Sequence, residues 1–210
     1  MEYLIIIIIF LFSVVIHEVS HGMVANSMGD PTAKYAGRLT LNPLKHLEIF
    51  GSVILPLFCI LMSKLGGGGF IFGWAKPVPY NPHNLKNQKF GPAMVAVAGP
   101  GANLIIALIF GILIRFIPLN SAYLYNLVNI FSFIVWVNLL LMVFNLVPIP
   151  PLDGSKILFA ALPYRYENIR INLERYGFFV LLFFVFFLFQ YLLPLILWLF
   201  KLIVGQGMGI

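Results

Sequence analysis

Long apolar segments alternate with short polar segments along the chain, and three of the apolar segments have about the length of a single membrane span. They lie at about residues 2–28, 92–117 and 123–147. Because a helix of roughly 20 residues spans the hydrocarbon core of a bilayer, each segment predicts one transmembrane helix. A fourth apolar segment, 176–204, is longer than one span needs. It predicts a helix that is tilted, or that is broken near Pro194.

The stretch between the first two predicted spans has a mixed pattern. Polar residues and prolines at 29–48 predict a loop with a short extended piece at 34–41. The apolar run 49–62 is short for a span, so a re-entrant helix and a full crossing are both open. Consecutive glycines then lead into 70–79, which favours an extended strand. Such backbone at membrane depth indicates either a cleft, where its edge could pair with an extended peptide, or a loop resting on the membrane surface.

Composition supports a membrane protein. Of 210 residues, 61% are hydrophobic and only 10% are charged, whereas soluble domains carry about 25% charged residues. The sequence therefore predicts an all-α polytopic membrane protein with 4–6 transmembrane helices and a re-entrant helix or extended strand between the first and second firm spans. We expect the lipid bilayer as its surroundings.

The net charge of +6 is explained by membrane topology, and we do not expect a nucleic-acid partner. Lysine and arginine gather in the polar segments, including a predicted basic loop at 164–175. Lys34, Arg38 and Lys45 follow the first span, whereas only Glu2 precedes it, so the C-terminal end of this span should face the cytoplasm. The first span lacks a basic start and a small-residue cleavage site, which favours a retained helix over a signal peptide.

Three ionisable residues lie in the second half of the first apolar segment, directly after the apolar run 3–16, in the pattern His17-Glu18-x-x-His21. Residues four apart share one helix face, so both imidazoles can bind one metal ion while Glu18 takes a proton from water. The alternative is a pair of histidines at the membrane surface with a glutamate facing water. Ionisable groups at membrane depth need a partner, which favours a cation.

A second polar motif, residues 145–154, ends the third apolar segment and delivers the carboxylate of Asp153 after three prolines. A catalytic zinc ion with two histidine ligands needs a third protein ligand, and Asp153 is a candidate. The competing interpretation is that Asp153 caps a helix starting near Ser155. The only cysteine, Cys59, excludes a thiolate cluster. The two motifs can meet only if the C-terminal ends of the first and third spans lie on one side of the membrane.

Other polar residues have simpler explanations. Asn103 follows a small-residue stretch, 98–102, that allows close helix packing, and its amide is more typical of an interhelical contact than of catalysis. His83 has no metal-spaced partner, and we expect it to be solvated.

The paired motifs His17-Glu18-Val19-Ser20-His21 and Asn145-x-x-Pro-x-Pro-Pro-Leu-Asp153-Gly resemble those of the site-two protease family of intramembrane zinc metalloproteases, as do residues 73–79 and 98–103. The resemblance implies one Zn²⁺ per chain bound by His17, His21 and Asp153, with Glu18 as general base. It further implies that Asn145 holds substrate or the oxyanion.

The resemblance also implies cleavage of transmembrane segments of substrate proteins, as in regulated intramembrane proteolysis, in a prokaryotic cell membrane with the active site nearer the cytoplasmic side. No PDZ or CBS module is visible. We expect a single membrane-embedded protease domain over 1–210, with a metal-binding core at about 1–160 and a C-terminal helix or broken helix at about 176–204. The substrate and the oligomeric state stay open.

Two other functional classes fit parts of the pattern. A metal transporter also places histidine and aspartate in membrane spans, but the sequence shows no internal repeat of the kind transporters carry. An inactive scaffold would use the same ligands only to hold the bundle together.

Overall fold

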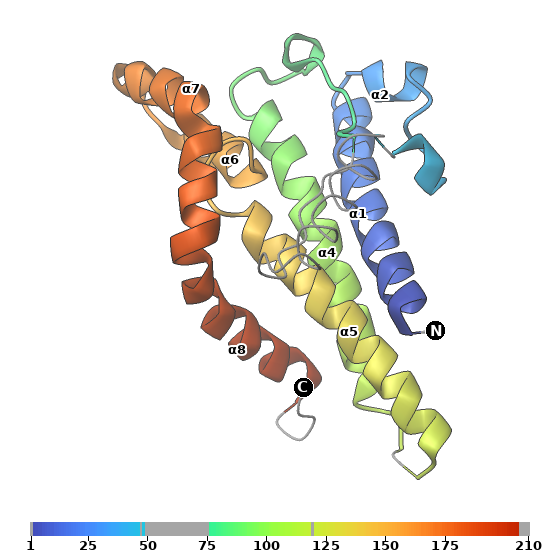
Figure 1. The fold of residues 1–210 in the computed structure, drawn as a ribbon. Helices are drawn as coiled ribbons and strands as arrows, with labels where there is room; N and C mark the ends of the chain where they lie inside the picture. The colour runs from blue at the N-terminus through green and yellow to red at the C-terminus, as the bar shows by residue number, and fades with distance from the viewer. Residues whose placement is uncertain (1, 47, 49–75, 119, 206–210) are drawn as a thin grey trace, which may run out of the picture.

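The protein is described here by a computed structural model, which defines residues 2–46, 48, 76–118 and 120–205. All regular elements in these ranges are helical (Figure 1). The α-helices are α1 (Glu2–Ser27), α2 (Thr32–Tyr35), α4 (Gly91–Ile114), α5 (Ala122–Asn145), α6 (Asp153–Ala161), α7 (Glu167–Phe183) and α8 (Leu193–Val204). Short 3₁₀ turns lie at Pro43–Lys45, Pro82–Asn84 and Tyr164–Tyr166.

Four helical segments among the described residues are long and apolar enough to cross a membrane. They are Leu4–Ser27, Gly91–Ile114, Ala122–Asn145 and Tyr164–Val204. The first three agree with the predicted spans within a few residues, and the all-α polytopic membrane class is confirmed. The predicted re-entrant helix or extended strand falls mostly on residues 49–75, outside the described residues.

Helix α4 lies at the centre of the bundle, in contact with α1, α5, α6 and α8. Helices α1 and α5 run in the opposite direction to α4, so their C-terminal ends lie at the same end of the molecule (Figure 1). The orientation of the first and third spans is therefore the one that the two motifs require. Buried apolar side chains of α4, α5 and α8, among them Leu139, Ile196 and Phe200, form the main core.

The last apolar segment is broken rather than straight. A π-helical turn, Phe184–Leu188, and a 3₁₀ turn, Phe189–Leu192, separate α7 from α8, which has Pro194 in its first turn. The tight contact between α7 and the proline motif is visible at Gly177, where an added Cβ would lie 2.6 Å from the Cβ of Pro150. Leu152 also packs in one buried cluster with Leu181. Helix α7 thus supports the turn that carries Asp153.

Two local predictions were wrong. The basic segment 164–175 is not a loop, because α7 already begins at Glu167. Its charges form ion pairs at helical spacing, Arg170 with Glu167 at 3.6 Å and with Glu174 at 3.1 Å, so they mark an exposed helix surface. The segment 34–41 is not extended, since its first residues belong to the short helix α2.

Candidate metal centre

Helices α1 and α4 face each other through residues at four-residue spacing. His17 and His21 on α1 are buried, and Gly99 of α4 lies opposite them. A Cβ on Gly99 would lie 2.6 Å from the Nε2 atom of His17 and would also collide with the ring of His21. The absence of a Cβ at Gly99 therefore lets α4 approach both imidazoles. The small residues at 98–102 were interpreted as allowing close helix packing. They do so, and Gly99 in addition makes room for the two imidazole rings.

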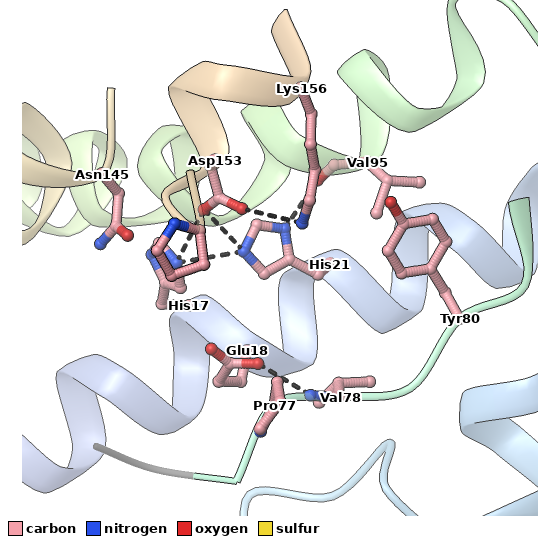
Figure 2. Close-up of a pocket in the computed structure, with 11 residues that line it drawn as sticks. His17, Glu18, His21, Pro77, Val78, Tyr80, Val95, Asn145, Asp153 and Lys156 are labelled. Atoms are coloured by element: carbon pink, nitrogen blue, oxygen red, sulfur yellow. Dashed lines mark hydrogen bonds and ion pairs between the residues drawn. The ribbon is translucent and has the colours of Figure 1, made fainter. Parts of the chain in front are cut away.

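Three potential ligand atoms converge at this point (Figure 2). The Nε2 atoms of His17 and His21 are 3.1 Å apart, and the Oδ2 atom of Asp153 lies 3.2 Å from the first and 3.0 Å from the second. All three side chains are buried, and among the described residues they form a group that could hold a metal ion. Tetrahedral zinc with bonds of about 2.0–2.1 Å separates its ligand atoms by about 3.3 Å, so the spacing fits.

The other nitrogen of each histidine ring is held by an oxygen atom. His21 donates from Nδ1 to the carbonyl oxygen of Val95 at 2.7 Å, and His17 donates from Nδ1 to Oδ1 of Asn103 at 2.6 Å. A ring with its proton on Nδ1 presents a lone pair at Nε2. Two lone pairs and a carboxylate oxygen therefore point at one another in a buried place. This arrangement calls for a cation between them.

Asp153 is the first residue of α6, and it does not cap that helix. The N-cap residue is Leu152, and no side chain supplies a capping hydrogen bond. The carboxylate instead reaches the two histidines through Oδ2, while Lys156, one turn further along α6, lies 3.4 Å from Oδ1. The interpretation of Asp153 as an N-cap was wrong.

Glu18 lies beside this cluster but outside it. Its Oε2 atom accepts a hydrogen bond of 2.9 Å from the backbone N–H of Val78, and the side chain faces the same cavity (Figure 2). A carboxylate that is next to the ligand group and is not part of it is free to accept a proton from water.

A cavity of ≈ 140 Å³ joins these groups. Its walls are formed by residues of α1, α4, α5, α6, the turn between α5 and α6, and the segment that precedes α4. They are His17, Glu18, His21, Pro77, Val78, Tyr80, Val95, Asn145, Pro151, Asp153 and Lys156. All five residues predicted for the site thus line one cavity. His83 lies in an exposed 3₁₀ turn and is absent from the cavity wall.

A buried carboxylate fixes the segment that brings Val78 to Glu18. Asp30, directly after α1, accepts hydrogen bonds from the backbone N–H of Asn81 at 2.6 Å and from the side-chain amide of Asn84 at 2.9 Å. Thr32 also donates to it. Burial acts to raise the pKa of the Asp30 carboxyl, but these donors outweigh it and hold the pKa below its usual value.

Sequence reasoning missed several of these partners. Val95, Gly99 and Asn103 repeat at four-residue spacing and so share one face of α4, as Ser13, His17 and His21 do on α1. That periodicity could have indicated matching faces. Lys156 stands three residues after Asp153, which is also a helical neighbour spacing. The N–H of Val78 carries no side-chain signal.

Comparison with known proteins agrees with this geometry. The model of peptidase family M50 matches residues 111–188, a range that contains Asn145 and Asp153 but not the two histidines. The chain is 39% identical over 187 residues to "Putative zinc metalloprotease YwhC" of Bacillus subtilis, which covers 87% of this chain and 79% of that protein.

A second relative, "Putative zinc metalloprotease Rip2" of Mycolicibacterium smegmatis, is 34% identical over 145 residues. The match covers 69% of this chain and 52% of that protein, so the chain corresponds to about half of its length. No solved structure matched the chain. On the level of identity to YwhC and the match to the family model, the chain belongs to peptidase family M50, the site-two protease family of membrane metalloproteases, and its cofactor is zinc.

Proposed function

We propose that this protein is an intramembrane zinc metalloendopeptidase that hydrolyses peptide bonds in transmembrane segments of other proteins. His17, His21 and Asp153 hold the zinc ion, Glu18 is the general base and Asn145 binds the reacting peptide group. The observation that carries the proposal is the convergence of three buried lone-pair atoms within 3.2 Å of one another, beside a carboxylate that takes no part in that cluster.

The chemistry divides among these groups. Zinc, when bound, polarises a peptide carbonyl and lowers the pKa of water toward 7. Glu18 accepts the proton of the attacking water and later delivers it to the leaving amine, which is the exchange expected of a general base. The N–H of Val78 holds one carboxylate oxygen of Glu18 and leaves the other for this proton.

Asn145 is the last residue of α5 and lines the cavity with its amide (Figure 2). Its Nδ2 atom donates to the carbonyl oxygen of Leu141, one turn earlier in the same helix, at 3.0 Å. This bond leaves the second N–H of the amide available. A preorganised donor of this kind can stabilise negative charge that develops on a peptide carbonyl oxygen.

The size of the cavity constrains the substrate. A volume of ≈ 140 Å³ accommodates a few water molecules or about one side chain. A helix about 10 Å in diameter does not fit. The scissile bond therefore reaches Glu18 only in an unwound segment, which requires a substrate helix to open locally.

The distribution of charge supports a site close to the cytoplasmic surface. The segments at the end of the bundle that holds the site are α2, the segment 76–90, α6 and the start of α7 (Figure 1). Basic residues are concentrated in these segments and in those next to them along the chain: Lys34, Arg38, Lys45, Lys76, Lys86, Lys89, Lys156, Arg165, Arg170 and Arg175. Arg115 and Lys201 lie at the opposite end, at the C-terminal ends of α4 and α8. The positive-inside rule then orients the metal centre toward the cytoplasm of a prokaryotic cell.

The proposal is tested by reconstituting the purified protein in liposomes with a reporter that carries one transmembrane helix. Wild type should cut the reporter inside its apolar segment, as located by mass spectrometry of the products. Glu18→Gln should retain zinc and lose activity by about 10²- to 10⁴-fold, because only the general base is removed. His21→Ala should lose both zinc and activity.

Other outcomes would assign the protein differently. Zinc binding without cleavage of any reporter would favour an inactive scaffold. Metal-dependent cation flux across the liposome membrane without proteolysis would favour a transporter. Full activity of Glu18→Gln would remove Glu18 from the mechanism.

A further inference from the structure

A chain of buried polar side chains connects the metal centre to the middle of the bundle. Asn103 of α4 and Asn138 of α5 are fully buried, and Ser13 of α1 is 4% exposed. The Nδ2 atom of Asn103 donates to Oδ1 of Asn138 at 2.8 Å and to the carbonyl oxygen of Ser13 at 3.4 Å. An unpaired amide in an apolar bundle costs several kcal/mol, so groups of this kind are kept only when they are bonded.

The direction of these hydrogen bonds is fixed by an atom that can only accept. Asn138 donates from Nδ2 to the carbonyl oxygen of Ile134 at 2.8 Å and to the hydroxyl of Ser13 at 3.0 Å. A rotated amide would set two oxygen atoms against each other at Ile134. The Oδ1 atom of Asn138 must therefore face Asn103, and it orients the Asn103 amide in turn.

The end of the chain is the contact with His17. Because the Nδ2 atom of Asn103 is committed to Asn138 and Ser13, its Oδ1 atom faces the ring of His17 and accepts from Nδ1 at 2.6 Å. This is the shortest bond of the set. It holds the proton of His17 on Nδ1 and leaves the lone pair of Nε2 directed at His21 and Asp153.

We infer that Asn103 is a positioning residue for His17, and that Asn138 and Ser13 act through it by locking the direction of its amide. The inference rests on the proposed function, in which His17 is a zinc ligand. It goes further in assigning three residues outside the cavity to the strength of zinc binding. In metalloproteins such outer partners orient ligating histidines, and their loss typically costs about 10- to 100-fold in metal affinity.

A purely interhelical role would be satisfied without His17. The bonds of Asn103 to Asn138 and Ser13 already join α4 to α5 and α1. If they were the whole purpose, substitutions would weaken the bundle and change zinc affinity only as far as they unfold it. The two roles can therefore be separated by measuring stability and zinc affinity in the same variants.

The experiment uses the full chain in detergent or nanodiscs, with the zinc dissociation constant measured by competition against a chromophoric chelator and the unfolding midpoint measured on the metal-free protein. Asn103→Leu removes the acceptor for His17 and should weaken zinc binding about 10- to 100-fold. Asn103→Asp keeps an acceptor for His17 but loses the donors to Asn138 and Ser13. It should be less stable than wild type yet bind zinc within about threefold of it.

Asn138→Leu should give an intermediate loss of affinity, because the amide of Asn103 is then free to rotate. The control is Asn129→Leu, the same substitution at an exposed position of α5, and it should leave the zinc dissociation constant unchanged. If Asn103→Leu does not fold, Asn103→Ala replaces it with the same expected loss.

Wild-type zinc affinity in the folded Asn103→Leu or Asn103→Ala variant would overturn the inference, as would equal losses in Asn103→Leu and Asn103→Asp. His17→Ala separates this failure from that of the proposed function. If His17→Ala abolishes zinc binding and Asn103→Leu does not affect it, only the inference fails. If His17→Ala binds zinc as wild type does, the proposed ligand set itself is wrong.

Discussion

The two sides of the cavity that holds the candidate metal centre are built in different ways. On the helical side, His17, His21 and Asp153 each have a second partner, respectively Asn103, the carbonyl of Val95 and Lys156. These groups lie on packed helices. On the other side is the segment 76–90, which contains one short 3₁₀ turn and mostly exposed side chains. It reaches the site through the N–H of Val78 and the ring of Tyr80, which lies 5.4 Å from Lys156 Nζ.

This difference indicates that zinc binding and turnover depend on separate parts of the molecule. If the proposed ligand set is right, the packed helices should hold the metal ion without help from the loop. The loop holds Glu18, the general base of the proposed mechanism, through the N–H of Val78, and Glu18 lies outside the proposed ligand group. Substitutions on the helical side should therefore change zinc affinity, whereas substitutions in 76–90 should change turnover while zinc is retained.

The largest effect is expected at Gly99. Gly99→Ala places a Cβ against both imidazole rings, so the metal-centre geometry cannot form without a shift of α1 or α4. We expect zinc content and proteolysis both to fall more than about 100-fold, beyond the usual loss from an outer partner. Gly101→Ala is the matched control, because a Cβ there meets nothing within 4 Å. Normal zinc content in Gly99→Ala would show that the two helices are not as close as described.

The next effect is expected at Val78, on the loop side. Val78→Pro removes the N–H that holds Glu18, and a hydrogen bond to a charged group is worth about 1.5–3 kcal/mol. The turnover number should fall roughly 10- to 100-fold with one zinc ion per chain retained. Val78→Ala keeps the N–H and should lose much less. A loss of zinc in Val78→Pro would mean that the two sides of the cavity are not independent.

A smaller effect is expected at Asp30, which acts on the same loop from a distance. Asp30→Asn removes the charge and replaces one of the two acceptor oxygens with an NH₂ group, so Asn81 or Asn84 loses its acceptor. The midpoint of thermal unfolding and the turnover number should both drop, while zinc content stays at the wild-type value. His83→Ala, an exposed change in the same turn, is the control.

This effect has a defined pH dependence. The pKa of Asp30 is lowered in the folded protein, so its contribution is complete above the unfolded value of about 3.9 and is lost as the pH falls through the folded value. The difference in unfolding midpoint between wild type and Asp30→Asn should be constant from about pH 5 to 8 and should shrink below about pH 4. A difference that grows with acidity would contradict this assignment.

The smallest effect is expected at Lys156. Its ammonium group is partly exposed and 3.4 Å from Asp153, so solvent weakens the interaction. Lys156→Met should weaken zinc binding only about two- to fivefold, and Lys156→Arg should restore most of the loss. A change as large as that of Asn103→Leu would place Lys156 among the groups on which the metal site depends most.

The sequence predicts the membrane spans of this protein better than it predicts the contacts of single residues. The spans and the pairing of the two motifs could be predicted because they depend on local apolar runs and fixed spacings, as at His17 and His21. The role of Asp153 could not be decided, since an N-cap and a ligand require the same residue in the same place. Only the packing of α6 against α4, which places Asp153 beside His17 and His21 of α1, distinguishes them.

Contacts between elements that are distant in the chain could not be predicted from the sequence. The partner of Asn103 depends on the register of three helices, and the partner of Glu18 is a backbone N–H. Segment 164–175 was misjudged because charged side chains were taken as a sign of a loop, although their spacing is helical. The prediction that an extended strand holds the substrate concerns residues 70–79, most of which lie outside the described ranges, and it stays a prediction.

The central claim is that two imidazoles and one carboxylate of this chain bind a single zinc ion. X-ray absorption at the zinc edge of the purified protein tests it directly. For the wild type we expect one zinc ion per chain, with nitrogen and oxygen ligands at about 2.0–2.1 Å and the scattering pattern of two imidazoles. Any residual zinc in His21→Ala should show the scattering of at most one imidazole. A sulfur ligand, or a wild-type spectrum with fewer than two imidazoles, would contradict it.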